Sequence, residues 1–209
     1  TRLAVSVVGA ATLAVAVAMP GVSAATHANR PHTTPTHNLC SRSALDVPSC
    51  GVLWGLYTPH QNYSSLEKAI GRQFDIVKNY TDFKPGSTFP NAPDLPLAQG
   101  GRIVFYDWNA VNYSTHAKVS YQAIANGTYD KSVIIPEARA LKAWPYKVFV
   151  DFDHENDSKA QAGKGTPAQY AAAYRHIHNV MAAQGVTNVI WTWVTTGYPP
   201  HEPQILASY

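Results

Sequence analysis

The strongest constraint on the fold is a regular alternation of short apolar stretches with segments of helical spacing. Five stretches rich in β-branched and aromatic residues are separated by segments whose apolar residues recur three or four positions apart. This alternation predicts parallel βαβ units, arranged either as a doubly wound sheet or as a (β/α) barrel. The expected strands are Val52–Tyr57, Phe74–Phe83, Arg102–Asn109, Lys147–Glu155 and Thr187–Val194.

The segments between these strands carry helix signals. The clearest has Thr166 as N-cap, Pro167 at the first helical position and Gly185 as C-cap. Its Ala-rich interior favours one long helix between the fourth and fifth strands. The other expected helices are Tyr63–Phe74, Asp94–Gln99, His116–Gly127 and Asp130–Trp144.

Neither a Gly-x-Gly-x-x-Gly loop nor a Walker-type loop follows any expected strand, which disfavours a nucleotide-binding sheet and favours a barrel. Barrel enzymes place their active residues at the carboxyl ends of the strands. Polar and aromatic residues gather at these ends here, whereas the strand bodies are apolar. The ends are Tyr57–His60, Tyr80–Asp82, Asp107–Asn109, His154–Asn156 and Trp193.

The first 28 residues resemble a secretory signal peptide. Arg2 precedes an apolar run, Leu3–Met19, and Pro20 and small residues follow it. A membrane anchor is the alternative, but the run is short for a bilayer. We therefore expect a secreted, extracellular protein without a membrane partner after cleavage.

Residues 29–50 form the expected linker, and residues 51–209 the expected partial barrel domain. The linker contains both cysteines of the chain, Cys40 and Cys50. In an oxidising compartment so close a pair predicts one disulfide, worth roughly 2–3 kcal/mol. Two thiols without nearby histidines are too few for a metal site.

The charge pattern excludes one class of partner. The formal net charge is +3, and no cluster of lysines and arginines or basic helix face is present, so nucleic acid is not an expected partner. The segment DFDHEND does not match a calcium loop, because Asn156 and Ala162 occupy the positions that require Gly and Glu. We expect no metal and no cofactor, and a monomer.

The stretches GLYTP, RIVFYDWNA, VFVDFDHE and GTPAQYAAAYRHIHNVMAAQGVTNVIWTWV resemble glycoside hydrolase family 26, best known for secreted β-mannanases. The resemblance implies a (β/α)8 TIM-type barrel of which about the first five β/α units are present in this chain. It also implies endo-β-1,4-mannanase-like, retaining hydrolysis of a plant-type β-linked polysaccharide. Glu155 matches the acid/base glutamate of the family.

Strand alternation gives this motif a geometry. If the strand continues through Glu155, then Glu155, Asp153 and Asp151 share one face, and neighbouring carboxylates would suit a proton-carrying group. His154 would point to the other side and position Glu155 or a sugar hydroxyl. Trp108 and Trp193, at strand ends, are expected to stack on sugar rings of the substrate.

The chain departs from the family pattern at several points. Asp151 stands where the family has Arg, and Asn156–Ser158 where it has Met-Asn-Gly. An acid at position 151 should disfavour a second ionised carboxylate nearby. The family nucleophile lies on a seventh strand, so we expect it beyond Tyr209 and expect this chain alone to be inactive.

Three alternatives remain open from the sequence. A non-catalytic polysaccharide-binding protein on a decayed barrel would need no second carboxylate. A deacetylase-like or metal-dependent hydrolase would use Asp151, Asp153 and His154. Acids at a strand end also often cap a helix or face water without any catalytic role.

Overall fold

The computed structural model describes residues 40–59 and 62–209, and this part of the chain is built around a parallel sheet. The sheet has five strands in the order β1-β2-β3-β6-β7, and every neighbouring pair is parallel. A two-stranded antiparallel hairpin, β4–β5, follows β3. The strands are β1 Gly55–Tyr57, β2 Ile76–Asp82, β3 Ile103–Asn109, β4 Val111–Asn112, β5 Ala117–Lys118, β6 Val148–Phe152 and β7 Val189–Thr192.

The strand order disfavours one of the two arrangements expected from the sequence, the doubly wound sheet. Spatial order follows chain order, without the reversal that defines a doubly wound sheet. The predicted five-stranded (β/α) fold with a parallel sheet is therefore confirmed. β1 and β7 are the edges of this sheet, so the described residues do not close into a barrel.

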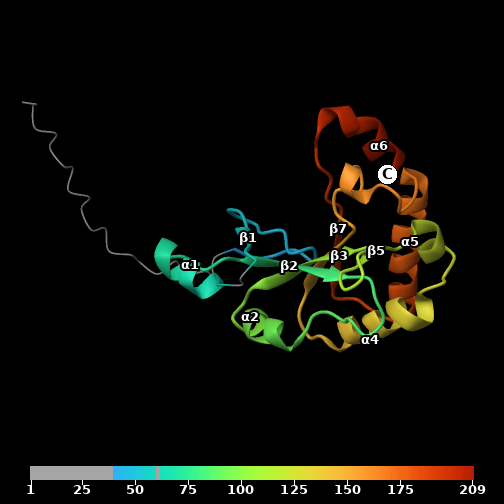
Figure 1. Cartoon of the computed structure of the whole chain (residues 1–209). Helices are drawn as coiled ribbons and strands as arrows, with labels where there is room; N and C mark the ends of the chain where they lie inside the picture. The colour runs from blue at the N-terminus through green and yellow to red at the C-terminus, as the bar shows by residue number, and fades with distance from the viewer. Residues whose placement is uncertain (1–39, 60–61) are drawn as a thin grey trace, which may run out of the picture. The chain divides into compact units, whose positions relative to one another are not determined.

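Helices connect consecutive strands (Figure 1). As drawn, α2 and α4 lie below the strands and α5 lies to their right. The expected helix at 116–127 is shorter than predicted, because Ala117–Lys118 pairs with Val111–Asn112 instead. The helices are α1 Tyr63–Ile70, α2 Leu95–Gln99, α3 Tyr121–Ala125, α4 Ile135–Ala143, α5 Pro167–Ala183 and α6 Glu202–Ala207, with single turns η1 Ala92–Asp94, η2 Asp130–Ile134 (π-helical), η3 Lys159–Gln161 and η4 Pro199–His201.

The longest helix, α5, forms as its sequence predicts. The Thr166 side chain accepts a hydrogen bond from the backbone N–H of Gln169, and the Gln169 side chain accepts one from the N–H of Thr166. This reciprocal pair satisfies two backbone donors at the helix start. The helix buries Tyr170, Ala173, Ile177 and Met181, spaced three or four apart, against the sheet.

The two faces of the sheet differ in character. Val104, Tyr106 and Trp108 of β3 join the apolar core with residues of the helices. Their neighbours Phe105 and Asp107 point to the opposite face, since side chains alternate along a strand. The register pairs Asp107 with Asp151 of β6, so both carboxyl groups lie on this second face.

The segment before β1 is tied by a disulfide. Cys40 and Cys50 are bonded, with their Cα atoms 5.5 Å apart. The predicted signal peptide, residues 1–28, and the first half of the predicted linker, residues 29–39, lie outside the described residues. Among residues 40–59 and 62–209, no helix is both long and apolar enough to cross a bilayer.

Candidate functional site

Two buried carboxyl groups lie side by side near the carboxyl ends of β3 and β6. Asp107 and Asp151 are paired in register, and both are fully buried. Lys78 of β2 places its Nζ 2.5 Å from Asp107 Oδ2, so one charge of the pair has a partner. Asp151 Oδ1 accepts a hydrogen bond of 3.3 Å from the backbone N–H of Val194.

The two carboxyl groups of this pair differ in the direction of their pKa shifts. Burial, and then the charge of Asp107, raise the pKa of Asp151 to about 9. Burial also acts to raise the pKa of Asp107. The contacts of the Asp107 carboxylate with His154 and Lys78 outweigh burial, so the pKa of Asp107 is lowered. Asp151 is thus a neutral acid at pH 7 that donates a hydrogen bond to an ionised Asp107.

The raised pKa of Asp151 bears on the prediction made for an acid at position 151. The sequence predicts that an acid there disfavours a second ionised carboxylate nearby, and the raised pKa of Asp151 means that Asp151 itself gives up its charge. When both groups are ionised, Asp151 Oδ2 is buried without a donor among the described residues. A proton on that carboxyl removes both the repulsion and the unsatisfied atom.

His154 is held beside this pair by one ring nitrogen. Its Nδ1 lies 3.0 Å from Asn109 Oδ1 and 3.3 Å from Asp107 Oδ1, both acceptors, so Nδ1 carries the proton. Nε2 therefore presents a lone pair when the ring is neutral. The ring of Tyr80 packs edge-on against the imidazole. His154 lies on the side of Asp107, not on the opposite side as the alternation predicted.

Glu155 follows His154 in an unusual backbone conformation. Its φ is +52°, and its N–H donates to Val194 O at 2.7 Å. The side chain is partly exposed, and within the described residues its carboxylate has no hydrogen-bond or ion-pair partner. A non-glycine residue held at positive φ often marks a functional position.

The prediction that Asp151, Asp153 and Glu155 share one face is wrong. β6 ends at Phe152, and Asp153 and Glu155 both have φ of +52°, which ends the strand alternation. Asp153 is fully buried in a separate cluster. Its Oδ1 lies 2.6 Å from Lys164 Nζ and accepts the N–H of Ala110 at 3.0 Å, while its Oδ2 accepts the hydroxyl of Tyr121.

A cavity of about 530 Å³ opens at the carboxyl ends of the strands. It brings together residues from four of the five predicted strand ends or the loops after them, among them His154. The two lysines of this cavity have no signal in the sequence, because Lys118 lies in the hairpin and Lys164 in the loop after η3. The lining residues are Tyr57, Tyr80, Asn109, Val111, Tyr113, His116, Lys118, His154, Ala160, Gln161 and Lys164.

Neither predicted tryptophan lines this cavity. Trp108 is 0% exposed, stacked on Phe83, with its indole N–H donating to Asp82 O, so no sugar ring can reach it. Its place in β3 directs it to the helix side of the sheet, which corrects the expected substrate contact. Trp193 donates its indole N–H to Asn156 Oδ1 and faces a different hollow.

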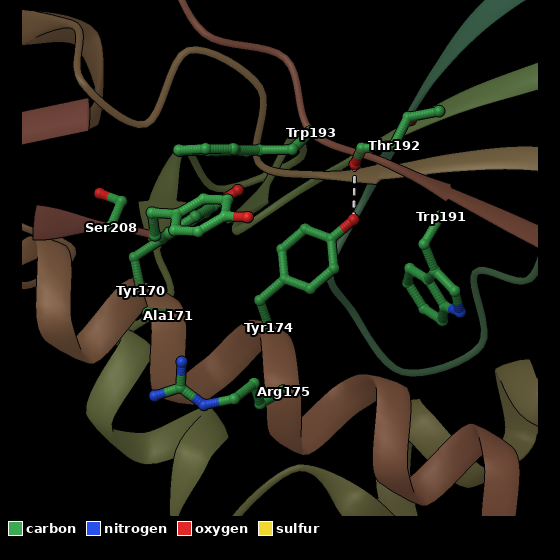
Figure 2. A pocket seen from close by; sticks show the side chains of 9 residues that line it. Tyr170, Ala171, Tyr174, Arg175, Trp191, Thr192, Trp193 and Ser208 are labelled. Carbon is green, nitrogen blue, oxygen red and sulfur yellow. Dashed lines mark hydrogen bonds between the residues drawn. The ribbon is translucent and has the colours of Figure 1, made fainter. Parts of the chain in front are cut away.

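That second hollow, of about 220 Å³, lies between α5 and the end of β7. Figure 2 shows Tyr174 between Tyr170 and Trp191, with its hydroxyl donating to the carbonyl oxygen of Thr192. The lining is mostly aromatic, and the rings of Trp193 and Tyr209 are 5.9 Å apart. Trp193 therefore belongs to an aromatic cluster separate from His154.

The residues proposed for a metal-dependent hydrolase do not converge. Asp151 contacts Asp107, Asp153 contacts Lys164, and His154 turns its Nδ1 to Asn109. In the part of the chain that the structure describes, no group of three or more His, Cys, Asp or Glu side chains is placed to hold a metal ion.

Comparison with known proteins gives a distant match. The chain is 25% identical to Endoglucanase H of Acetivibrio thermocellus over 136 residues. The match spans 62% of this chain but 14% of the length of Endoglucanase H. No protein-family model matches the sequence.

Proposed function

We propose that this chain belongs to a secreted glycoside hydrolase of the family 26 type, with Glu155 as its acid/base residue. In this proposal the sheet is part of a (β/α)8 barrel, and the substrate is a β-linked polysaccharide of the mannan kind. Hydrolysis proceeds with retention, which requires a second carboxylate about 5 Å from Glu155.

The observation that carries the proposal is the free carboxylate of Glu155. The other acids near the strand ends are engaged within the described residues: Asp82 with Lys84, Asp107 with Lys78, Asp151 with Asp107, Asp153 with Lys164, and Asp157 with Thr196 and His201. A general acid must reach the leaving oxygen of its substrate, and only an unengaged carboxyl group can do so.

The neighbourhood of Glu155 supports the same assignment. The preceding residue, His154, lines the cavity, so a sugar bound there lies next to the Glu155 backbone. The backbone carbonyl oxygen of Val194 holds this loop by accepting a hydrogen bond from the N–H of Glu155. The match to Endoglucanase H adds an independent reason to expect hydrolysis of a glycosidic bond.

Glu155→Gln is expected to lower the hydrolysis of polysaccharide by about a hundredfold or more, since the amide cannot protonate the leaving oxygen. An activated aryl glycoside needs less protonation and should lose much less in its first step. Azide should restore turnover with the aryl glycoside, because a small anion needs no general base. The rates are measured on mannan, on β-glucan and on the aryl glycoside.

Glu202→Gln is the matched control for this test. Glu202 is an exposed glutamate at the start of α6, also without a partner among the described residues, but it is away from the strand ends. It should leave all three rates unchanged. If Glu155→Gln hydrolyses polysaccharide at the wild-type rate, Glu155 is not the acid/base residue.

A second candidate function has its own supporting observation. Among the described residues, no second unengaged carboxylate lies at a strand end. A non-catalytic polysaccharide-binding protein would need no such second carboxylate. Turnover and binding distinguish the two candidates. Wild-type protein that binds mannan or β-glucan without hydrolysing either would establish the second one.

A further inference from the structure

The cavity at the strand ends has a distinctive charge pattern. Four of the side chains that line it are lysines or histidines, namely His116, Lys118, His154 and Lys164, whereas no Asp or Glu of the described residues lines it. Glu155 lies outside the lining, so the cavity is a binding subsite next to the proposed acid and not the reaction centre itself.

Lys118 is the cation of this cavity that no acid neutralises. Its Nζ donates to the backbone carbonyl oxygens of Ala160, at 3.4 Å, and Ala162. These contacts orient the ammonium group toward the loop after β6 but do not cancel its charge. Lys118 has no carboxylate partner in the described part of the chain.

The second ammonium group, on Lys164, adds to the positive field. Asp153 pairs with it, but the group is buried, which lowers the pKa of Lys164, and the charge of Lys118 lowers it further. Both lysines line the cavity, and Lys118 contacts the carbonyl oxygen of Ala162, two residues before Lys164. Asp153 is already committed to Lys164 and Tyr121, so it does not compensate Lys118.

The acids beneath His154 do not compensate Lys118 either. The charge of Asp107 is matched by Lys78, and Asp151 is neutral at pH 7. A bound anion would be the first negative charge to face Lys118, and it would also relieve the repulsion between the two lysines.

The rest of the lining favours a sugar as the carrier of that anion. Tyr57, Tyr80 and Tyr113 are 46%, 37% and 42% exposed, so each presents part of its side chain to a ligand in the cavity. Aromatic faces pack on the apolar C–H face of a pyranose, and the Nε2 lone pair of His154 accepts a hydrogen bond from a hydroxyl group.

We propose that this cavity binds an acidic sugar unit of the polysaccharide, a uronate, whose C6 carboxylate lies against Lys118. The inference rests on the proposed function and specifies the substrate class of the same site. The neutral mannan expected from the family resemblance would then be a poorer ligand than its C6-oxidised counterpart.

Two β-1,4-linked tetrasaccharides test the proposal, because they differ only at C6: tetramannuronate and mannotetraose. Calorimetric titration should show tetramannuronate binding about tenfold more tightly at low salt, and the difference should shrink as salt is added. The methyl ester of tetramannuronate, which is uncharged, should bind like mannotetraose. Equal affinity for the acid and its ester would overturn the proposal.

Variants assign the effect to one ammonium group. Lys118→Gln should abolish the preference for the acid, and Lys118→Arg should preserve it. Lys159→Gln is the matched control, since Lys159 is an exposed lysine next to Ala160 that does not line the cavity. A preference that survives in Lys118→Gln would contradict the assignment.

Two further points separate this inference from a non-specific anion site and from the proposed acid/base role of Glu155. Acetate or inorganic phosphate that binds as tightly as tetramannuronate would show an anion site without carbohydrate recognition, against the proposal. The titrations measure binding and not turnover, so their outcome does not depend on whether Glu155 protonates a leaving oxygen. Failure of the proposed acid/base role would therefore leave the uronate preference intact, and the reverse also holds.

Discussion

Asp151→Asn is expected to make the folded protein more stable at pH 7, by up to about 4 kcal/mol. Most substitutions of fully buried residues destabilise a protein. This one should have the opposite effect, because the native Asp151 is forced to hold a proton that an unfolded aspartate releases. Asparagine mimics the protonated carboxyl group: it donates to Asp107 and accepts from the N–H of Val194 without any proton uptake.

The sign of the pH dependence follows from the direction of the pKa shift. The pKa of Asp151 is raised in the folded state to about 9. Between the ordinary aspartate pKa of about 4 and that value, the folded protein binds one proton more than the unfolded chain. The contribution of Asp151 to stability is therefore complete below about pH 4 and is lost as the pH rises toward 9. The advantage of Asp151→Asn should be absent near pH 4 and grow with pH.

Urea denaturation of wild type and Asp151→Asn at pH 4, 7 and 8.5 measures this difference. Asp153→Asn is the matched control, since Asp153 is equally buried but is paired with Lys164, and its loss should destabilise the protein. A wild type as stable as Asp151→Asn at pH 8.5 would show that the two buried acids do not share a proton.

The strand and helix pattern could be predicted because it depends on short-range periodicity. The strands around Val77, Val104 and Val150 lie where the apolar runs place them, and the capping signals at Thr166 mark the start of α5. Strand ends were harder to predict. Nothing in the apolar pattern shows that β6 stops at Phe152, where the backbone turns to positive φ at Asp153.

The candidate site was predictable only in part for the same reason. Sequence position placed Tyr80, Asn109 and His154 at strand ends, and the structure brings them to one cavity. Which side chain meets which carboxylate depends on the register between strands, and register is a long-range property. The contact of Lys78 with Asp107, which the register pairs with Tyr80, and the contact of the loop residue Lys164 with Asp153 therefore have no signal in the sequence.

Protonation state explains how this site tolerates an acid where the family resemblance leads one to expect an arginine. A buried arginine at position 151 would supply a positive charge to Asp107. Here Lys78 of the neighbouring strand supplies that charge, and Asp151 supplies a hydrogen bond as a neutral acid. Lys78 thus supplies the positive charge that an arginine at position 151 would supply. The aspartate at position 151 is therefore not by itself evidence that the site has lost its function.

Lys164→Met is expected to destabilise the protein by about 3–5 kcal/mol, because it leaves the fully buried Asp153 carboxylate without its ion partner. The Lys164 side chain is itself 4% exposed, so water cannot replace the ammonium group. Asp153 keeps hydrogen bonds from Tyr121 and Ala110, which favours the lower end of this range. Urea denaturation at pH 7 measures the change.

The double variant Lys164→Met with Asp153→Asn separates the cost of an unpaired charge from the loss of packing. Removing both charges should recover most of the stability, since a buried ion pair is worth little more than a neutral pair of similar shape. Lys159→Met, at an exposed position, should change stability by no more than about 0.5 kcal/mol. If the double variant is no more stable than Lys164→Met alone, packing of the lysine stem, and not its charge, holds the loop that carries His154 and Glu155.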